Sequence, residues 1–185
     1  MKNRPYGNRL TSLIFALAFI VSVTCFTGVS QVAAAVWSWG ANGYGQVGDG
    51  TVTDRVLPAQ VLNLTNVTAI GGGYYHSLAL KPDGTVWGWG YNEEGELGDG
   101  SVTNRLTPVQ ATGLTNVVTV AAGDWHSLAL KSDGTVWAWG WNDYGQVGDN
   151  TTFNKLLPVM VNGLTDVIAI AGGVAHSLAL RADGT

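Results

Sequence analysis

Short alternations of large and small side chains recur along the chain and predict β-strands. In Trp37-Ser38-Trp39 the two indoles are separated by one small residue, and in His76-Ser77-Leu78-Ala79-Leu80 large and small side chains alternate. Alternation with a period of two places the large side chains on one face of a strand. We therefore predict strands at 37–39 and 76–80, and the small residues of the second let a neighbouring sheet approach closely.

Turn residues and a proline predict how these strands are connected. Lys81-Pro82-Asp83-Gly84 lies between two alternating runs, and Asp-Gly in that place favours a hairpin because Gly accepts the positive φ of a tight turn. A third strand is expected at 67–70. A weaker fourth strand is expected at 59–62, beginning after Pro58 at a sheet edge, because Pro cannot donate to a ladder. Residues 42–50 are predicted to form a structured turn region.

The same pattern occurs three times at a spacing of 50 residues, without insertion or deletion. The copies are 36–85, 86–135 and 136–185, and 21 of the 50 aligned positions are identical in all three. Four short strands in a repeat of about 50 residues are typical of propeller blades. We therefore predict an all-β fold made of three four-stranded β-propeller blades.

The first 35 residues differ from the repeats and have the three parts of a secretory signal peptide. Three basic residues among the first nine precede an apolar run at 10–23, and Ala33-Ala34-Ala35 provides an A-x-A-type cleavage site. The run is shorter than the roughly 20 residues that a membrane span usually needs. We expect a signal peptide at 1–35, cleaved after Ala35, and a secreted or cell-envelope location. An uncleaved membrane anchor is the alternative, and only then would the chain contact a membrane.

Charge and composition narrow the function classes. Hydrophobic residues make up 46% of the chain and charged residues 12%, which favours a packed domain over disorder. Cleavage removes three of nine basic residues and none of thirteen acidic ones, so that six remain against thirteen and the net charge becomes −7. A chain of that charge is a poor ligand for nucleic acid. The single cysteine, Cys25, lies in the removed segment, so packing rather than disulfides must stabilise the repeats.

The repeat resembles that of the regulator-of-chromosome-condensation family. The shared series is Val-Trp-x-Trp-Gly at 36–40, an Asn- and Gly-rich turn, Pro58, His-Ser-Leu-Ala-Leu at 76–80 and Asp83-Gly84, and it recurs in order in all three copies. The resemblance covers 36–185 and, with the signal peptide, indicates a secreted bacterial-type member. It implies a seven-bladed propeller. Three blades are fewer than the four to eight that close a ring, so we expect either a fragment of a longer protein or a ring completed by several chains.

Residues that are invariant between the copies are predicted to be structural. His76, His126 and His176 should be buried and hydrogen-bonded, because equivalent residues of successive blades lie too far apart to share a zinc ion. The aspartates of the Gly-Asp and Asp-Gly-Thr motifs should form turns, because neither motif supplies the several oxygens of a calcium loop. The tryptophans of Val-Trp-x-Trp-Gly should pack between blades, with a sugar-binding platform or a light-absorbing cluster as alternatives. No cofactor or metal is expected.

Loop positions that differ between the copies are the candidate binding residues. Equivalent loops of a propeller gather on one face of the ring, where they can form a continuous recognition surface. Exposed Tyr and Trp side chains are the residues that most often anchor interfaces. Neutral variation of exposed loops is the alternative explanation. The candidates are Tyr44, Tyr74, Tyr75, Tyr91, Glu94, Asp124, Trp125, Trp141 and Tyr144.

The predicted function is binding without catalysis. The sequence contains no nucleophile elbow, P-loop or His-Glu-x-x-His motif. We expect a secreted or cell-envelope scaffold that binds a protein partner through its variable loops. The first alternative is a cell-surface glycan-binding module that uses Tyr44, Tyr74, Tyr75, Trp125, Trp141 and Tyr144. The second is guanine-nucleotide exchange, which the resemblance implies through the founding member of the family, and the signal peptide and acidic charge argue against it.

Overall fold

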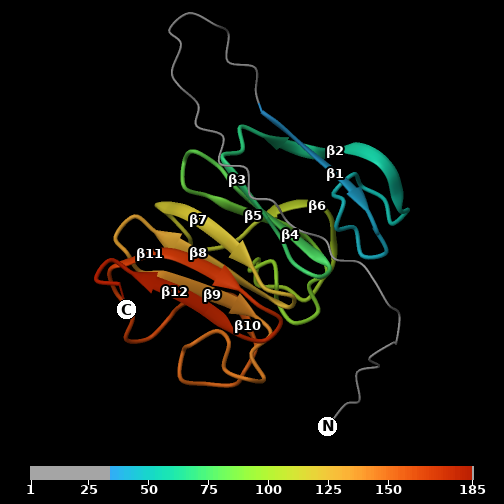
Figure 1. Ribbon diagram of the computed structural model, residues 1–185. Coiled ribbons are helices and arrows are strands. Elements are labelled where there is room, and N and C mark those ends of the chain that lie inside the picture. The colour runs from blue at the N-terminus through green and yellow to red at the C-terminus, as the bar shows by residue number, and fades with distance from the viewer. Residues whose placement is uncertain (1–33, 185) are drawn as a thin grey trace, which may run out of the picture. The chain divides into compact units, whose positions relative to one another are not determined.

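The computed structural model describes residues 34–184, and the predicted signal peptide lies almost entirely outside these residues. Twelve strands follow one another (Figure 1). In this part of the chain no helix is long and apolar enough to cross a membrane. The first six strands are β1 (Ala35–Gly40), β2 (Arg55–Thr65), β3 (Ala69–Gly72), β4 (His76–Leu80), β5 (Val86–Gly90) and β6 (Arg105–Gln110). The last six are β7 (Val117–Ala122), β8 (His126–Lys131), β9 (Val136–Gly140), β10 (Lys155–Met160), β11 (Val167–Gly172) and β12 (Ser177–Arg181).

The strands form two complete four-stranded sheets and two half-sheets, all antiparallel. The complete sheets have the orders β3-β4-β5-β6 and β7-β8-β9-β10, while β1-β2 and β11-β12 form pairs at the two ends of the described array (Figure 1). Each complete sheet takes two strands from one 50-residue sequence repeat and two from the next. The half-sheet β1-β2 corresponds to the last two strands of a complete sheet, and β11-β12 corresponds to the first two.

The predicted hairpin forms between β4 and β5. Lys81 N–H donates to the Thr85 carbonyl at 3.0 Å, and Asp83 accepts from the backbone N–H of Thr85 at 3.0 Å. Gly84 has a φ of +78°, and a Cβ there would lie 2.8 Å from the backbone nitrogen of Asn116. The turn therefore needs Gly for its backbone angle and for the close approach of the next segment.

The proline strand begins earlier than predicted. β2 starts at Arg55 rather than at residue 59, so Pro58 lies inside it, and Pro108 lies inside β6 in the same way. The proline strand is still an edge strand of its sheet, as predicted. The pairing of β5 with β6 shifts register between Gly88 and Gly90, which accommodates the missing N–H of Pro108.

The turn region after each first strand is organised by a buried asparagine. Asn92 is fully buried, its side-chain oxygen accepts from Leu97 N–H at 2.9 Å, and its amide donates to Asp99 at 3.2 Å. Asp99 also forms an ion pair with Arg105 at 2.7 Å. Burial alone would raise the pKa of Asp99, but its hydrogen bonds from Ser101 and Arg105 hold that pKa below its usual value. The aspartates of this motif therefore stabilise turns, as predicted.

The hydrophobic core lies between successive sheets and is built around one tryptophan per interface. Trp89 packs with Val61 and Leu64, and Trp139 is fully buried in the next cluster. Trp37 and Trp39, by contrast, are 55% and 63% exposed, so the prediction that all these tryptophans pack between blades is wrong for the first copy. The reason is that no sheet precedes β1-β2 within residues 34–184.

Two of the three histidines are buried and hydrogen-bonded, as predicted. His76 Nε2 lies 2.9 Å from Ser127 Oγ, and His126 Nε2 lies 3.0 Å from Ser177 Oγ. Burial, and then the charge of His126, lowers the pKa of His76 to about 3. His176 differs, because it is exposed and lies at the end of the described array. Among residues 34–184 no group of His, Cys, Asp and Glu is arranged to hold a metal ion.

Candidate binding surface

Backbone hydrogen bonds gather the variable loops at one end of the sheets. Within the sheets, Tyr91 N–H donates to the Tyr75 carbonyl and Trp141 N–H donates to the Trp125 carbonyl, each at 2.9 Å. Between the sheets, Tyr74 N–H donates to the Asp124 carbonyl at 3.1 Å. The β3–β4 loop, the β7–β8 loop and the residues after β5 and β9 are therefore connected in one continuous segment of surface.

Five aromatic side chains from these loops form one cluster. Tyr75 lies at its centre, with ring centroids 4.3 Å from Tyr74, 4.7 Å from Tyr44, 5.5 Å from Trp125 and 6.4 Å from Tyr91. Tyr91 also contacts Tyr44 at 5.1 Å and Trp125 at 5.3 Å. Most of the pairs are steeply tilted, which is a favourable arrangement of aromatic rings. We call these five residues the aromatic cluster.

The aromatic cluster is buried at its base and exposed at its rim. Tyr91 is only 9% exposed, whereas Tyr44 is 36% and Tyr74 57% exposed. Tyr75 and Trp125 are half-buried. The buried members fix the position of the exposed ones, so the cluster presents rigid apolar surface with phenol groups at its edge. Such groups can stack, fill a pocket and donate hydrogen bonds.

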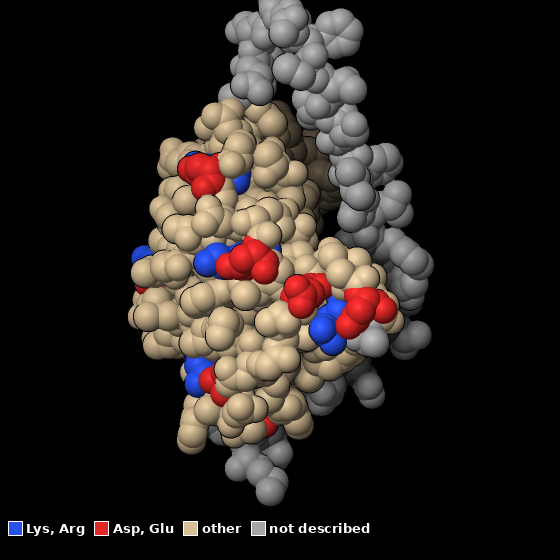
Figure 2. Space-filling model, turned by 90° about the vertical axis from the view of Figure 1, so that its left-hand side faces the viewer, with Lys and Arg blue, Asp and Glu red and all other residues tan. Residues whose placement is uncertain are grey.

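Acidic groups lie near Tyr91, the buried member of the aromatic cluster. The Tyr91 hydroxyl donates to Glu93 at 3.2 Å, and burial together with the charges of Glu93 and Glu96 raises the pKa of Tyr91. Burial also raises the pKa of Asp124. Most of the face shown in Figure 2 carries no charge, and the basic groups visible there lie beside acidic ones. That face has no basic stripe of the kind that binds nucleic acid.

The remaining candidates lie outside the aromatic cluster. Trp141 and Tyr144 form a separate edge-to-face pair at 5.3 Å, in which Tyr144 is 73% exposed. Glu94 accepts a hydrogen bond from the side chain of Asn154 in the neighbouring turn. The structure thus brings five of the nine candidates together, places two beside each other, and uses Glu94 in a contact between turns. The ninth, Asp124, accepts from Tyr74 N–H through its backbone carbonyl.

Sequence reasoning missed the backbone carbonyl groups of Gln46, Glu96 and Gln146, to which the invariant Ser and Trp side chains donate. The Glu96 carbonyl accepts from Ser127 Oγ and from Trp139 Nε1, each at 2.7 Å. These positions alternate between Gln and Glu along the repeats, because the contact uses the main chain and not the side chain. The available signal was the invariance of the serine, which donates across the sheet interface.

A sequence model of the regulator of chromosome condensation (RCC1) repeat matches residues 34–80, 83–130 and 133–180. A second model of the same repeat matches residues 67–96 and 117–146. The first model alone covers well over half of the chain. The chain belongs to the RCC1 repeat family. Its RCC1 repeats include all twelve described strands except Lys131 at the end of β8 and Arg181 at the end of β12.

Solved structures of RCC1-type propellers have the same fold. Prp20p from Saccharomyces cerevisiae is 24% identical with a TM-score of 0.71, over 78% of this chain and 39% of that one. A yeast RCC1 (Prp20) bound to Kap60 is 28% identical with a TM-score of 0.71, over 81% and 38%. Human WBSCR16 is 26% identical with a TM-score of 0.70, over 80% and 41%. The chain thus spans about two fifths of these structures and has their all-β blade architecture.

Proposed function

We propose that this chain is a scaffold that binds a protein partner through the aromatic cluster. The observation that carries the proposal is the convergence of five Tyr and Trp side chains from loops of successive sheets. Large aromatic side chains held on a rigid base lose little conformational entropy on binding, and they dominate the binding energy of many interfaces. The repeats that carry these loops share 21 of 50 positions, whereas the loop residues of the cluster differ between the copies.

The similar structures support a protein as the class of partner. Prp20p has binding properties toward Gsp1p and histones, and the second yeast structure contains Kap60. Since the chain spans about two fifths of those proteins, the identity of their partners does not transfer to it. Two acidic residues near the cluster, the exposed Glu93 and the half-buried Asp124, favour a partner surface that is apolar at its centre and basic at its edge.

The proposed place of action is outside the cell or in the cell envelope. The proposal rests on the signal-peptide pattern of residues 1–35, which lie outside the described residues except for the last two. A partner is therefore best sought among extracellular and envelope proteins.

A glycan is the second candidate ligand, because Tyr74 and Trp125 offer a nearly flat pair of rings. Their centroids lie 5.6 Å apart and their planes differ by 31°, the smallest angle in the aromatic cluster. A flat aromatic surface of this kind can stack on the apolar face of a sugar ring. Binding on a glycan array that is lost in Tyr74→Ala would favour this candidate over a protein partner.

The test compares proteins captured by the wild-type chain with those captured by a Tyr74→Ala/Trp125→Ala variant, from the extracellular and envelope fractions of the source. Truncation of interface hot spots costs about 2 kcal/mol or more, so we expect a loss of roughly thirtyfold in affinity for the specific partner. Phe153→Ala is the matched control, because Phe153 is 76% exposed and lies outside the aromatic cluster. Equal capture by the double variant and the wild type would overturn the proposal.

A further inference from the structure

The loops that carry the aromatic cluster contain acidic residues and no basic ones. They hold seven of the thirteen Asp and Glu residues of the chain, and Lys and Arg are absent from them. The six basic residues that follow residue 35 all lie elsewhere. The negative charge of the repeats is therefore concentrated around the candidate binding surface. The loops are residues 41–54, 73–75, 91–104 and 123–125.

Two of these seven carboxylates are neutralised inside the turns. Asp49 forms an ion pair with Arg55, and Asp99 forms the equivalent pair with Arg105. Each arginine follows its loop directly in the sequence. Both arginines are therefore already bound by the turn that precedes them.

Two other carboxylates at the aromatic cluster form no ion pair within residues 34–184. Glu93 is exposed and accepts from the Tyr91 hydroxyl at 3.2 Å. Asp124 is half-buried, directly precedes Trp125, and accepts from Tyr74 N–H through its backbone carbonyl. Burial raises the pKa of Asp124, because the carboxylate loses water without gaining a positive neighbour. Both carboxylates are thus positioned at the cluster with their charge uncompensated.

The rings of the aromatic cluster are the kind of surface on which a cation stacks. The face of an aromatic ring is negative, so it attracts a Lys or Arg group within about 6 Å of its centroid. This chain uses the same contact elsewhere. Lys81 Nζ lies 4.3 Å from the ring centroid of Trp87, and Lys131 Nζ lies 5.2 Å from that of Trp137. The loops of the aromatic cluster, by contrast, bring no Lys or Arg of their own.

The arrangement of Tyr74 and Trp125 favours a planar cation over a compact one. Their ring planes differ by only 31°, and Tyr74 is 57% exposed. A guanidinium group is flat, weakly hydrated and stacks on aromatic faces, whereas the ammonium group of lysine is compact and strongly hydrated. A guanidinium can also donate two parallel hydrogen bonds to one carboxylate. Arginine therefore matches both the rings and the acids of this surface.

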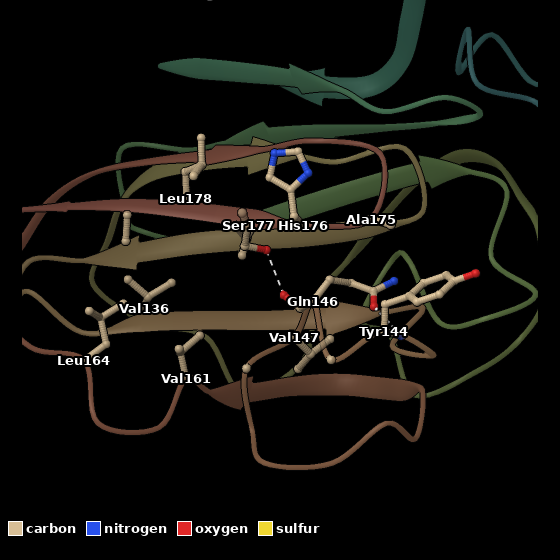
Figure 3. Close-up of a pocket in the computed structure, with 14 residues that line it drawn as sticks. Val136, Tyr144, Gln146, Val147, Val161, Leu164, Ala175, His176, Ser177 and Leu178 are labelled. Carbon is tan, nitrogen blue, oxygen red and sulfur yellow. Dashed lines mark hydrogen bonds between the residues drawn. The ribbon is translucent and has the colours of Figure 1, made fainter.

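The third repeat has the same turn without the five-ring cluster. Tyr144 and Ala175 stand 100 residues after Tyr44 and Tyr75, and both line the pocket drawn in Figure 3. A ring contact of 4.7 Å in the first turn is thus replaced by a tyrosine and a methyl group. The exposed Asp143 keeps an acidic residue in this turn. The third turn therefore offers a matched control for a site that needs rings and acids together.

We propose that the protein partner inserts an arginine side chain at the aromatic cluster. The guanidinium stacks on the exposed ring of Tyr74 beside Trp125, and Asp124 and Glu93 supply the opposite charge. The aliphatic part of the arginine packs on the rings at the rim of the cluster. This mode of recognition rests on the proposed function, because it specifies the chemistry of the partner at the same site.

The first experiment measures binding of the purified chain to immobilised peptides in which one central residue is varied within random flanking residues. We expect peptides with a central arginine to retain roughly tenfold more protein than peptides with a central leucine. Peptides with a central lysine should lie clearly below those with arginine, because an ammonium group stacks less well. Equal retention on arginine and leucine peptides, or on arginine and lysine peptides, would overturn the proposal.

The second experiment removes the two carboxylates and keeps the size of their side chains. Glu93→Gln/Asp124→Asn should lower retention on the arginine peptides roughly tenfold and leave retention on the leucine peptides unchanged. The control, Asp143→Asn/Asp166→Asn, changes the net charge equally at two exposed residues outside the cluster. At about 0.15 M salt distant charges are screened, so the control should bind like the wild type. Equal losses in the two double variants would show an effect of net charge alone and overturn the proposal.

Capture of the partner separates a failure of arginine recognition from a failure of the proposed function. We expect both Tyr74→Ala/Trp125→Ala and Glu93→Gln/Asp124→Asn to lose the specific partner. Loss in the aromatic variant with full capture by the carboxylate variant would overturn arginine recognition and leave the proposed function standing. Full capture by both variants would overturn both. Binding to a glycan array without a preference for arginine peptides would assign the surface to a sugar and likewise overturn arginine recognition.

Discussion

At the scale of single residues, a short relay of hydrogen bonds joins each pair of sheets. Ser127 has one hydroxyl proton, which it donates to the Glu96 carbonyl at 2.7 Å. Its oxygen must therefore accept from His76, so the neutral imidazole of His76 carries its proton on Nε2. The relay ends where Trp139 donates to the same carbonyl.

Ser127→Ala tests this relay. The change leaves the buried N–H of His76 without an acceptor, and we expect a loss of about 1–3 kcal/mol in the free energy of unfolding measured with urea. Ser77→Ala is the control, because Ser77 also donates to a carbonyl but accepts from no histidine in the described residues. Equal losses in the two variants would show that the histidine contact contributes nothing.

The two buried histidines also predict how stability depends on pH. Burial lowers the pKa of His76 to about 3 and that of His126 to about 4, below the ordinary value of about 6.5. Between these values the unfolded chain binds protons that the folded chain does not, so stability falls as the pH falls below about 6.5. Each histidine contributes up to about 1.4 kcal/mol per pH unit there.

Urea unfolding between about pH 7 and pH 4.5 measures this slope. His126→Gln keeps a donor for Ser177 but cannot titrate, so this variant should lose about half of the slope. A slope unchanged in His126→Gln would mean that other groups control the acid sensitivity.

Invariant residues predicted the local role of each side chain, but not whether its neighbour is present. The expectation that the histidines are buried and hydrogen-bonded is confirmed for His76 and His126, while His176 is exposed. In the same way, Trp139 is buried as expected, whereas its counterpart Trp39 is exposed. In both cases the partner belongs to an adjacent sheet 50 residues away, so a repeat at the end of the described array has half of its contacts.

At the scale of the strands and turns, the 50-residue period predicted the length of a repeat but not the residue at which each sheet begins. The predicted Asp83-Gly84 hairpin joins 76–80 to the next repeat, and a tight hairpin forces its two strands into one sheet. The sheet boundary therefore falls within the sequence repeat, between β2 and β3. Propensity could not place the start of β2, because Pro58 suggested an end to pairing where the structure has a bulge and continues.

Gly84→Ala tests what this hairpin needs. Gly84 and Gly113 both have φ of +78°, but only Gly84 lies against the backbone of Asn116. Gly113→Ala should cost about 1 kcal/mol for the backbone angle alone. Gly84→Ala should cost clearly more, about 2–4 kcal/mol, because the added Cβ also pushes the next segment away. Thermal unfolding of the two variants compares them, and equal melting temperatures would show that the close approach does not matter.

At the scale of the whole molecule, the fold class was predictable and the binding surface only partly. An all-β RCC1-type propeller follows from the repeat, and the comparisons confirm it. The sequence identified loops that vary, but not which variable residues meet. Tyr44 and Trp125 lie in different repeats and reach the same cluster only because the sheets are packed side by side, whereas Tyr144 lies apart from them.

The half-repeat offset between sequence and sheet has a consequence for how such chains grow. Each 50-residue unit carries one tryptophan of this kind and the apolar residues that receive the tryptophan of the next unit, as Trp89 beside Val61 and Leu64 shows. Tandem duplication of a unit therefore adds one inserting tryptophan together with the residues that receive one. This holds whichever residue the duplicated segment starts from. Duplication or deletion of whole units can therefore change the length of the array and still leave every internal interface with a tryptophan and the residues that receive it.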